Sequence, residues 1–367
     1  MKVLMISTDR NIFDEKSEAR QRMIEYGGLV EELHIIIFTK RKHQIASTKF
    51  QENSNVFLYS TNSRTKLFYV FDALEIGKKI LDYKGQWLIT SQDPFETGLA
   101  GWLIARKAKI PLQLQIHTDF LSPYFVRHSV LHRLRVWIAK FLIRRANCIR
   151  VVSERIKNSL LQVIGRKPQA KIVVLPIFVD VEKTKNAPVS IDLHKKYLQF
   201  DFIILMASRF TKEKNISLAI ETMWKIVRQY PKTGLVIVGS GPEETNLKSQ
   251  ISNLKVNGNI KIENWTNDLT SYYKTADLFL LTSNYEGYGR TLIEATAAGC
   301  NIISSDVGIA DEILDRENIF EPGNKEQLKE KIISAIESNI KPPKALLQQT
   351  KDQYLLEYKK SWEICAF

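Results

Sequence analysis

The stretch LFLLTSNYEGYGRTLIEATAAG, residues 278–299, contains the three kinds of segment from which a parallel α/β sheet is built. Its first part, LFLLTS, is a continuously apolar run, which is typical of a strand buried on both faces. The turn NYEGYG holds two glycines, and RTLIEATAAG then has the composition of a helix that ends at a glycine. A strand, a glycine-rich turn and a helix in this order predict one βα unit of a parallel sheet.

The same alternation of apolar runs and helical patterns continues along the whole chain, in two series. The runs that predict strands are 2–7, 32–39, 56–60, 86–90, 112–118, 148–153 and 171–176 in the first series, and 202–208, 234–240, 260–264, 278–283 and 301–306 in the second. Two such series predict an α/β protein with two Rossmann-like domains, whose parallel sheets face a central cleft.

The domain boundary is expected near PIFVDVEKTKNAPVS, where the apolar periodicity stops. We therefore predict an N-terminal domain over residues 1–183 and a C-terminal domain over residues 184–345. The tail, residues 346–367, returns to a helical pattern, and we expect this helix to cross back to the first domain.

The composition is that of a globular protein without a membrane span, with 44% apolar and 25% charged residues. The apolar stretch at the start of the chain is shorter than a signal peptide requires and reads as a first strand. Three cysteines, Cys148, Cys300 and Cys365, are far apart and odd in number. This pattern predicts neither a disulfide framework nor a zinc site, and it favours a reducing, cytoplasmic setting.

The positive charge of the chain is confined to its first half. Residues 1–186 contain 31 basic and 17 acidic residues, whereas the remainder contains 22 basic and 23 acidic residues. The asymmetry suggests that the first half faces an anionic partner, which could be nucleic acid, a phospholipid surface or a phosphorylated substrate. A basic surface that serves solubility alone is the simpler alternative.

Two cations follow the strand at 202–208, just before a predicted helix. Arg209 and Lys214 would stand beside the N-terminus of that helix, whose backbone N–H groups and dipole favour negative charge. The arrangement predicts a site for a diphosphate, and an ordinary basic loop remains the alternative.

A glycine pair, Gly239 and Gly241, follows the strand at 234–240. It matches part of the dinucleotide-binding pattern G-x-G-x-x-G, but Glu244 occupies the third glycine position. The pair predicts either a turn that admits a nucleotide close to the backbone or a turn required by the geometry between sheet and helix.

The turn after the strand at 278–283 carries two glutamates. Glu286 lies in the glycine turn, and Glu294 lies one helical turn inside the following helix, among small apolar residues. A carboxylate in such surroundings needs a polar partner, and the two hydroxyls of a ribose fit that requirement. The turn N–H groups of Gly287, Tyr288 and Gly289 would bind an anion or a sugar hydroxyl. Alternatively, the glutamates are solvated charges, or the acid and nucleophile of a glycoside hydrolase.

Together, the segments LPIFVD, SRFTKEKN, VGSGPE and EGYG, with the Glu286/Glu294 spacing, resemble the retaining glycosyltransferases of family 4, which have the GT-B fold. The similarity is densest over residues 202–313 and thins in the first half. It implies transfer of a hexose from a nucleotide-diphosphate sugar, a UDP- or GDP-sugar, with no further cofactor and no metal ion. A GT-B phosphorylase is disfavoured, because such chains are usually much longer and bind a pyridoxal cofactor.

The resemblance also implies roles for individual residues. Arg209 and Lys214 match the cations that hold the donor diphosphate, Glu294 matches the glutamate that binds the nucleotide ribose, and Glu286 matches the glutamate that contacts the donor sugar. The backbone that lines the sugar and phosphate corresponds to Gly287, Tyr288, Gly289, Arg290 and Thr291. The growing charge on the leaving diphosphate would be stabilised by the two cations and a helix N-terminus.

The first half is expected to bind the acceptor. His117, at the end of the strand at 112–118, resembles the histidine that family members place beside the donor sugar, and Asp119 follows it. After the first strand, the family commonly has a glycine-rich loop, whereas this chain has no glycine and carries Arg10 and Arg20. These arginines suggest an acceptor with an anionic group.

The segment 120–151 contains no acidic residue. Between positions 127 and 145 its basic residues are Arg127, Arg133, Arg135, Lys140, Arg144 and Arg145, and an apolar stripe is formed by Leu131, Leu134, Ile138, Phe141 and Leu142, with Trp137 beside it. A basic amphipathic helix with aromatic residues is typical of a membrane-surface element, although a helix packed on its own sheet would show the same pattern.

The sequence therefore predicts a retaining glycosyltransferase, associated peripherally with the cytoplasmic face of the membrane, that acts on a lipid-linked or glycan acceptor in cell-envelope synthesis. The competing hypothesis is a protein that uses the basic half to bind nucleic acid or an anionic surface without sugar transfer. Because no recognisable nucleic-acid-binding module is present, we expect no nucleic-acid partner.

Overall fold

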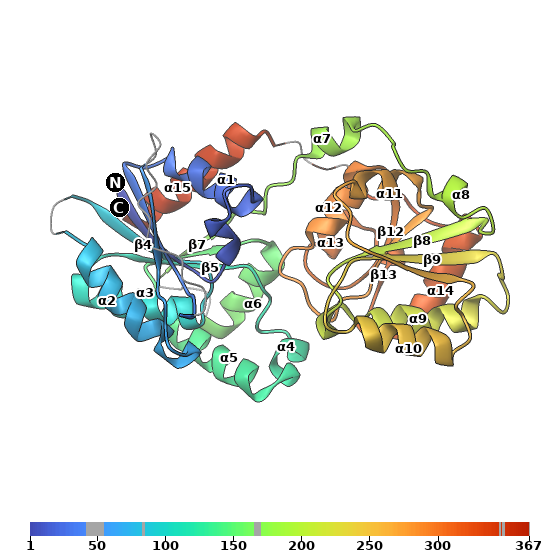
Figure 1. Cartoon of the computed structure of the whole chain (residues 1–367), viewed down its shortest axis with the longest axis horizontal. Helices are drawn as coiled ribbons and strands as arrows, with labels where there is room; N and C mark the ends of the chain where they lie inside the picture. Colours follow the sequence, from blue (N-terminus) through green and yellow to red (C-terminus); the bar gives the residue numbers. More distant parts are fainter. Residues whose placement is uncertain (42–54, 83–84, 165–169, 345, 347–348, 367) are drawn as a thin grey trace. The chain divides into compact units, whose positions relative to one another are not determined.

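The computed structural model describes residues 1–41, 55–82, 85–164, 170–344, 346 and 349–366. The chain divides into two compact units, and each contains one parallel sheet covered by helices (Figure 1). Unit 1 comprises Met1–Pro176 together with Thr350–Phe367, and unit 2 comprises Ile177–Gln349. The division falls just after Pro176, where the linker segment begins.

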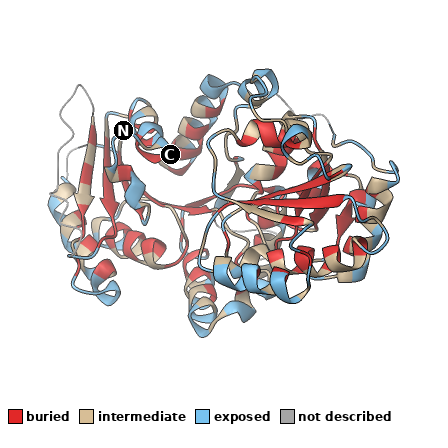
Figure 2. Ribbon diagram, turned by 45° about the vertical axis from the view of Figure 1, so that its right-hand side comes forward, coloured by how far each residue is buried: buried red, intermediate tan, exposed pale blue. Residues whose placement is uncertain are grey.

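Unit 1 has a seven-stranded sheet with the order β3-β2-β1-β4-β5-β6-β7. Its strands are β1 (Lys2–Ser7), β2 (Glu32–Ile37), β3 (Val56–Ser60), β4 (Trp87–Ser91), β5 (Leu112–Ile116), β6 (Cys148–Val151) and β7 (Lys171–Val174). Its helices are α1 (Glu18–Gly27), α2 (Tyr69–Ile80), α3 (Glu96–Ala108), α4 (Pro123–His128), α5 (Val130–Leu142), α6 (Glu154–Ile164) and α15 (Lys351–Ala366). The central strands are buried on both faces, so the core lies between the sheet and its two helical layers (Figure 2).

The C-terminal helix α15 packs on the sheet of unit 1 through a mixture of aromatic and polar contacts. The side chains of Tyr358 and Trp362 are fully buried. Gln113 Nε2 on β5 donates to the carbonyl of Ser361 over 2.9 Å, and Gln115 Nε2 donates to Tyr358 Oη over 3.2 Å. Because buried polar groups need partners, these glutamines tie the helix to one position on the sheet.

A disulfide joins Cys148 on β6 to Cys365 on α15, with 5.5 Å between their Cα atoms. The prediction that the cysteines form no disulfide is therefore wrong for this pair. The partners lie 217 residues apart in sequence, and only the return of α15 to unit 1 brings them together. The argument for a reducing compartment, which rested on the cysteine pattern, does not hold. Cys300 is a buried free thiol, and burial raises its pKa to about 12.

Unit 2 has a six-stranded sheet with the order β10-β9-β8-β11-β12-β13. Its strands are β8 (Phe202–Ala207), β9 (Thr233–Val238), β10 (Ile260–Glu263), β11 (Leu278–Leu281), β12 (Asn301–Ser305) and β13 (Ile319–Phe320). Its helices are α7 (Val181–Asn186), α8 (Leu193–Lys196), α9 (Ile216–Ile226), α10 (Glu244–Asn253), α11 (Leu269–Thr275), α12 (Arg290–Ala297), α13 (Ala310–Ile313) and α14 (Lys325–Ile336).

The strand order of unit 2 reverses between β8 and β11, which lie side by side in parallel. The first strand of the unit, β8, also pairs with β9 on its other side. At such a reversal, no chain connection covers the loops that follow the two central strands. Ligands of open α/β sheets bind at this point. In unit 2 these are the loop after β8 and the loop after β11.

Candidate active site

The loops that follow β8 and β11 are fastened to each other by direct hydrogen bonds. The backbone N–H of Asn284 donates to the carbonyl of Glu213 over 2.8 Å. Thr282 Oγ1 donates to the carbonyl of Lys214 over 2.8 Å, and Asn215 Nδ2 donates to Asn284 Oδ1 over 3.1 Å. These bonds fix two loops that are far apart in the sequence into one surface at the carboxyl edge of the sheet.

Two of the predicted site residues, Lys214 and Glu286, contact each other on this surface. Lys214 Nζ lies 2.5 Å from Glu286 Oε1, and Ser283 Oγ donates to the same carboxylate oxygen over 2.8 Å. Both charged side chains are only 16% exposed. A partly buried charge is costly without a partner, so each residue holds the other in position. The sequence identified both residues but gave no sign that they would pair.

Arg209 lies in the loop after β8 and reaches into solvent, with its side chain 80% exposed. Its Nη2 lies 4.0 Å from Oε1 of Glu213 in the same loop. The guanidinium therefore presents its planar set of N–H donors to the solvent side of the loop.

The glycines after β9 support the loop that carries Arg209. Gly239 and Gly241 have φ values of 153° and 155°, and a Cβ on them would lie 1.9 Å from the carbonyl oxygen of Ser208 and 2.5 Å from that of Phe210. Phe210 N–H also donates to the carbonyl of Ser240 over 2.8 Å. The two backbones can approach this closely only because these positions are glycine. This close approach of the two backbones explains why both positions are glycine, without any contact to a ligand.

The turn between β11 and α12 is held from a third loop, the one after β12. The carbonyl of Tyr288 accepts a hydrogen bond from Ile309 N–H over 2.9 Å. A Cβ on Gly308, which has a φ of +56°, would lie 2.3 Å from that same carbonyl oxygen. Gly289, with a φ of +95°, occupies the cap position before α12 begins at Arg290. Sequence analysis missed Gly308, because no motif marks the close approach of the two loops.

Glu294 is bound through both carboxylate oxygens. Arg290 Nε donates to Glu294 Oε1 over 2.7 Å, and Tyr273 Oη on α11 donates to Glu294 Oε2 over 3.3 Å. Burial and the nearby carboxylate raise the pKa of Tyr273 well above its usual range, so the phenol keeps its proton and remains a donor. The contact between Arg290 and Glu294 has the spacing of one helical turn and could be predicted from the sequence, whereas the contact with Tyr273 could not. Thr291 lies beside Arg290 in the first turn of α12.

A further residue of this surface, Tyr285, was also missed. Burial, together with the carboxylates of Glu213 and Glu286, raises the pKa of Tyr285 to about 12. Its hydroxyl therefore stays protonated next to two acids. A tyrosine in a glycine-rich turn carries no signal of its own in a single sequence, which is why the residue was not predicted.

In unit 1, His117 and Asp119 follow β5 at the carboxyl edge of the sheet. Burial, and then the positive charges of Arg150 and Arg22, lower the pKa of His117 to about 3, so its imidazole is neutral at physiological pH. In this state Nε2–H donates to Gln115 Oε1 over 3.2 Å. Burial raises the pKa of Asp119, against the opposing effect of Arg155.

The arginines after β1 differ in their surroundings. Arg20 is 3% exposed, and its Nη1 donates to the carbonyl of Ile12 over 2.8 Å. Its buried position does not fit the predicted contact with an anionic acceptor, because the guanidinium of Arg20 binds the turn that precedes α1. Arg10 is exposed, and it donates to the carbonyl of Phe38 and to Tyr69 Oη over 3.3 and 3.2 Å.

The predicted basic helix is broken into α4 and α5 at Ser129, which accepts a hydrogen bond from His132 N–H as the cap of α5. Val136 and Leu142 are buried, whereas Leu134 is 52% and Trp137 is 67% exposed. Of the predicted apolar stripe, Leu131 and Leu134 are exposed, Ile138 and Phe141 are half-buried, and Leu142 is buried.

The basic residues around this exposed side differ in their contacts. Arg135 pairs with Glu96 on α3 over 3.0 Å, and the Arg145 guanidinium lies 3.6 Å from the ring centroid of Phe141. Arg127, Arg133, Lys140 and Arg144 are exposed. No helix among those described is both long and apolar enough to cross a bilayer. Within the described ranges, no three His, Cys, Asp or Glu side chains are grouped so as to hold a metal ion.

Two protein-family models match this chain, one in each half. The model described as Glycosyltransferase Family 4 matches residues 40–183, and the model described as Glycosyl transferases group 1 matches residues 192–353. The chain belongs to the family 4 glycosyltransferases. The resemblance seen in the motifs is thereby confirmed, and it extends into the first half, where the motifs were sparse.

Individual proteins share moderate similarity with the chain. It is 27% identical over 246 residues to α-monoglucosyldiacylglycerol synthase of Streptococcus pneumoniae, a match that covers 63% of this chain and only 54% of that protein. It is 25% identical over 354 residues to an uncharacterised glycosyltransferase of Methanocaldococcus jannaschii, covering 93% of this chain and 92% of that one.

Solved structures confirm the fold. The structure of HepE from Anabaena in complex with UDP-glucose superimposes with a TM-score of 0.68 at 20% identity, covering 100% of this chain and 94% of HepE. The two units with their parallel sheets therefore have the GT-B architecture that the sequence predicted.

Proposed function

We propose that this glycosyltransferase moves a hexose, with retention of configuration, from a UDP-linked donor to a lipid-linked or glycan acceptor in cell-envelope synthesis. The observation that carries the proposal is the Lys214–Glu286 pair beside the exposed Arg209, on the loops that follow β8 and β11. The UDP-glucose bound to HepE supports a uridine donor, and the glycolipid synthase of Streptococcus pneumoniae supports a lipid-linked acceptor.

The proposed reaction breaks the bond between the sugar C1 and the donor phosphate and forms a bond from C1 to the acceptor oxygen. Negative charge grows on the departing diphosphate, where Arg209, Lys214 and the N-terminus of α12 would stabilise it. The leaving phosphate would accept the proton of the attacking hydroxyl, which enters on the face that the phosphate vacates. This division of roles explains how the reaction proceeds without a separate carboxylate base, and the two cations replace a metal ion.

The two glutamates have separate roles in this proposal. Glu294 accepts hydrogen bonds from Arg290 and Tyr273, and a carboxylate, with about four acceptor sites, can bind more than two donors, so we assign it to the ribose hydroxyls. Glu286 would accept hydrogen bonds from the donor sugar. We do not assign them as the acid and nucleophile of a hydrolase, because Glu294 is engaged by two protein donors.

Unit 1 would supply the acceptor side. His117, neutral at physiological pH, would serve as a hydrogen-bonding group and not as a general acid, since its protonated form is disfavoured by burial and two arginines. Arg10 is the arginine of the first loop that would contact an anionic acceptor, and Asp119 lies at the same carboxyl edge.

We further propose that α5 holds the enzyme at the cytoplasmic face of an anionic membrane. Leu134 and Trp137 are exposed among Arg133, Lys140 and Arg144, so apolar and basic groups share one side of the helix. A bilayer surface offers both an anionic layer and an apolar layer, whereas the backbone of a nucleic acid offers no apolar surface. The exposed leucine and tryptophan therefore favour the membrane over nucleic acid.

The proposed donor site is tested by ligand-dependent stability and by donor hydrolysis. UDP, GDP, ADP and CMP sugars are compared by thermal shift, since a ligand that binds the folded chain raises its melting temperature. We expect UDP-sugars to give the largest shift, Glu294→Ala to abolish it, and Arg209→Ala to reduce hydrolysis with less effect on the shift. If both variants keep wild-type shifts and hydrolysis, the assignment of the site is wrong.

A further inference from the structure

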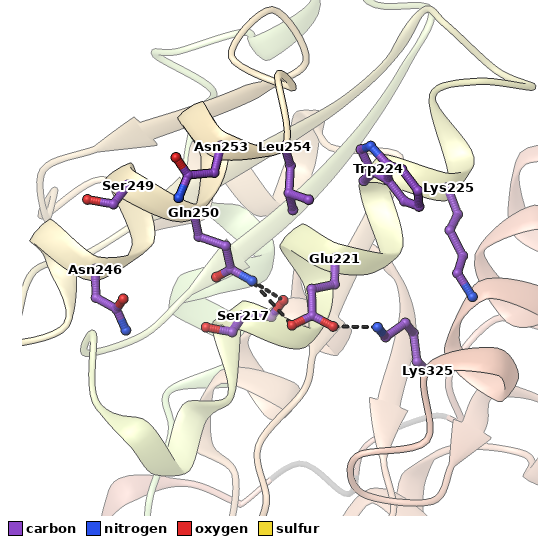
Figure 3. A pocket seen from close by; sticks show the side chains of 10 residues that line it. All are labelled: Ser217, Glu221, Trp224, Lys225, Asn246, Ser249, Gln250, Asn253, Leu254 and Lys325. Carbon is purple, nitrogen blue, oxygen red and sulfur yellow. Dashed lines mark hydrogen bonds and ion pairs between the residues drawn. The ribbon is translucent and has the colours of Figure 1, made fainter.

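Unit 2 contains a groove that none of the donor-binding residues line. It lies on the helical side of the unit, where α9, α10 and the start of α14 meet, and has a volume of about 600 Å³ (Figure 3). Glu221 and Trp224 on α9 and Gln250 and Asn253 on α10 contribute to its walls. These residues approach from different helices, so the groove is a feature of the folded unit and not of one segment.

The chemistry of the walls suits a ligand that has many hydroxyl groups. Asn246, Gln250 and Asn253 bring side-chain amides, each of which both donates and accepts hydrogen bonds, and Glu221 brings a carboxylate acceptor. The indole of Trp224 adds one aromatic surface, and the guanidinium of Arg228 lies 3.8 Å from its ring centroid. Amides beside a fixed aromatic ring match the alternating hydroxyl edges and C–H faces of sugar rings.

The charges in the groove are compensated, which argues against an anionic ligand. Lys325 forms an ion pair with Glu221, and Lys225 forms an ion pair with Glu326. Gln250 Nε2 donates to Glu221 Oε1 over 3.4 Å, so the carboxylate is also held in place (Figure 3). A phosphate or a nucleic acid would need lysines whose charge is not already balanced. The groove therefore favours a neutral ligand.

The groove also begins near the proposed donor site. Ser217 lines it from the first turn of α9, and Lys214 lies two positions before the first residue of that helix, Ile216. From Ser217 to Lys225 the wall formed by α9 runs for about 12 Å along the helix axis. An extended chain with one end at the carboxyl edge of the sheet would be able to follow this wall away from the site.

We infer that the groove binds a neutral oligosaccharide segment, at a position separate from the residues that perform the transfer. The inference rests on the proposed function only in its choice of a glycan as the occupant. The walls provide hydrogen bonds and one aromatic face in an open groove, so binding of a single segment is weak and serves to retain a long glycan.

The experiment uses the full chain and defined oligosaccharides. Maltoheptaose, cellohexaose and chitohexaose serve as neutral probes and tripolyphosphate as the anionic probe, with binding measured by saturation-transfer NMR and titration calorimetry. The Gln250→Ala/Asn253→Ala double variant removes two amides that line the groove, and Asn257→Ala removes an exposed amide that does not line it.

We expect at least one neutral probe to bind the wild type and the Asn257→Ala variant equally, and the double variant to bind it about tenfold more weakly, as two lost hydrogen bonds predict. UDP binding and donor hydrolysis should stay at wild-type levels in the double variant. The inference is overturned if no neutral probe binds, if the double variant binds as well as the wild type, or if tripolyphosphate binds preferentially. Failure of the proposed function would appear separately, as absent UDP binding and donor hydrolysis in the wild type.

Discussion

Replacing Gly308 by alanine should displace the turn that carries Glu286. The new Cβ would lie 2.3 Å from the carbonyl oxygen of Tyr288, and real Cβ atoms approach no closer than about 3.0 Å, so the turn must move by about 0.7 Å or more. The φ of +56° adds about 1–2 kcal/mol of backbone strain for a residue with a Cβ. We expect a total loss of about 2–4 kcal/mol in the free energy of unfolding.

Gly299→Ala is the matched control, because it carries the same kind of strain without the collision. Gly299 has a φ of +78°, and nothing lies within 4 Å of the Cβ that would be added. This variant should lose about 1–2 kcal/mol, measured by urea unfolding, and keep its donor hydrolysis. Gly308→Ala should lose roughly tenfold to a hundredfold in donor hydrolysis, since misplacing a site by close to 1 Å has effects of this size. Equal hydrolysis in the two variants would refute the idea that the loop after β12 positions the turn.

Three other changes test separate parts of the molecule. Glu286→Gln removes the charge that neutralises its lysine partner, so UDP should bind more tightly in calorimetry while transfer from UDP-sugars falls; weaker UDP binding would contradict this. Burial raises the pKa of Asp93 from 3.8 to about 6, so the fold loses stability as the pH rises through this range. Asp93→Asn should therefore recover up to about 3 kcal/mol of the free energy of unfolding in urea at pH 7.5, but little at pH 4. Equal gains at the two pH values would exclude the buried charge as the cause. Serine at both Leu134 and Trp137 should release the protein from anionic vesicles in flotation assays, whereas serine at Leu198, which is 84% exposed in unit 2, should not; unchanged flotation of the double variant would remove the membrane proposal.

The fold followed from the sequence because buried parallel strands are continuously apolar, and this property is local. Each predicted run coincides with a strand, and the one strand missed among the described residues is β13, whose two residues, Ile319 and Phe320, are too few to show a pattern. Contacts between segments that are distant in the sequence were harder to predict. The disulfide of Cys148 with Cys365 depends on the return of α15, and the division of the basic segment into α4 and α5 depends on the cap at Ser129.

The residue types of the candidate site could be predicted from the sequence, but the contacts between these residues could not. Arg209, Lys214 and Glu286 stand in short motifs after strands, so the chemistry that they offer could be read from the sequence. The pairing of Lys214 with Glu286 joins positions 72 residues apart, and no periodicity predicts it. Gly308 and Tyr273 were missed for the same reason, since each matters only through a contact made in the folded unit.

If Lys214 and Glu286 have the proposed roles, their ion pair would couple recognition of the sugar to stabilisation of the leaving group. While Glu286 accepts from Lys214, part of the ammonium charge is offset and acts less strongly on a diphosphate. A donor sugar whose hydroxyls donate to Glu286 would draw that carboxylate away and leave the ammonium to the phosphate oxygens. Arg209 is exposed and lies 4.0 Å from the carboxylate of Glu213, so its charge would reach a diphosphate without such an exchange. A nucleotide without the right sugar would then meet one effective cation and the correct donor would meet two, which makes the stabilising charge depend on the substrate that is bound.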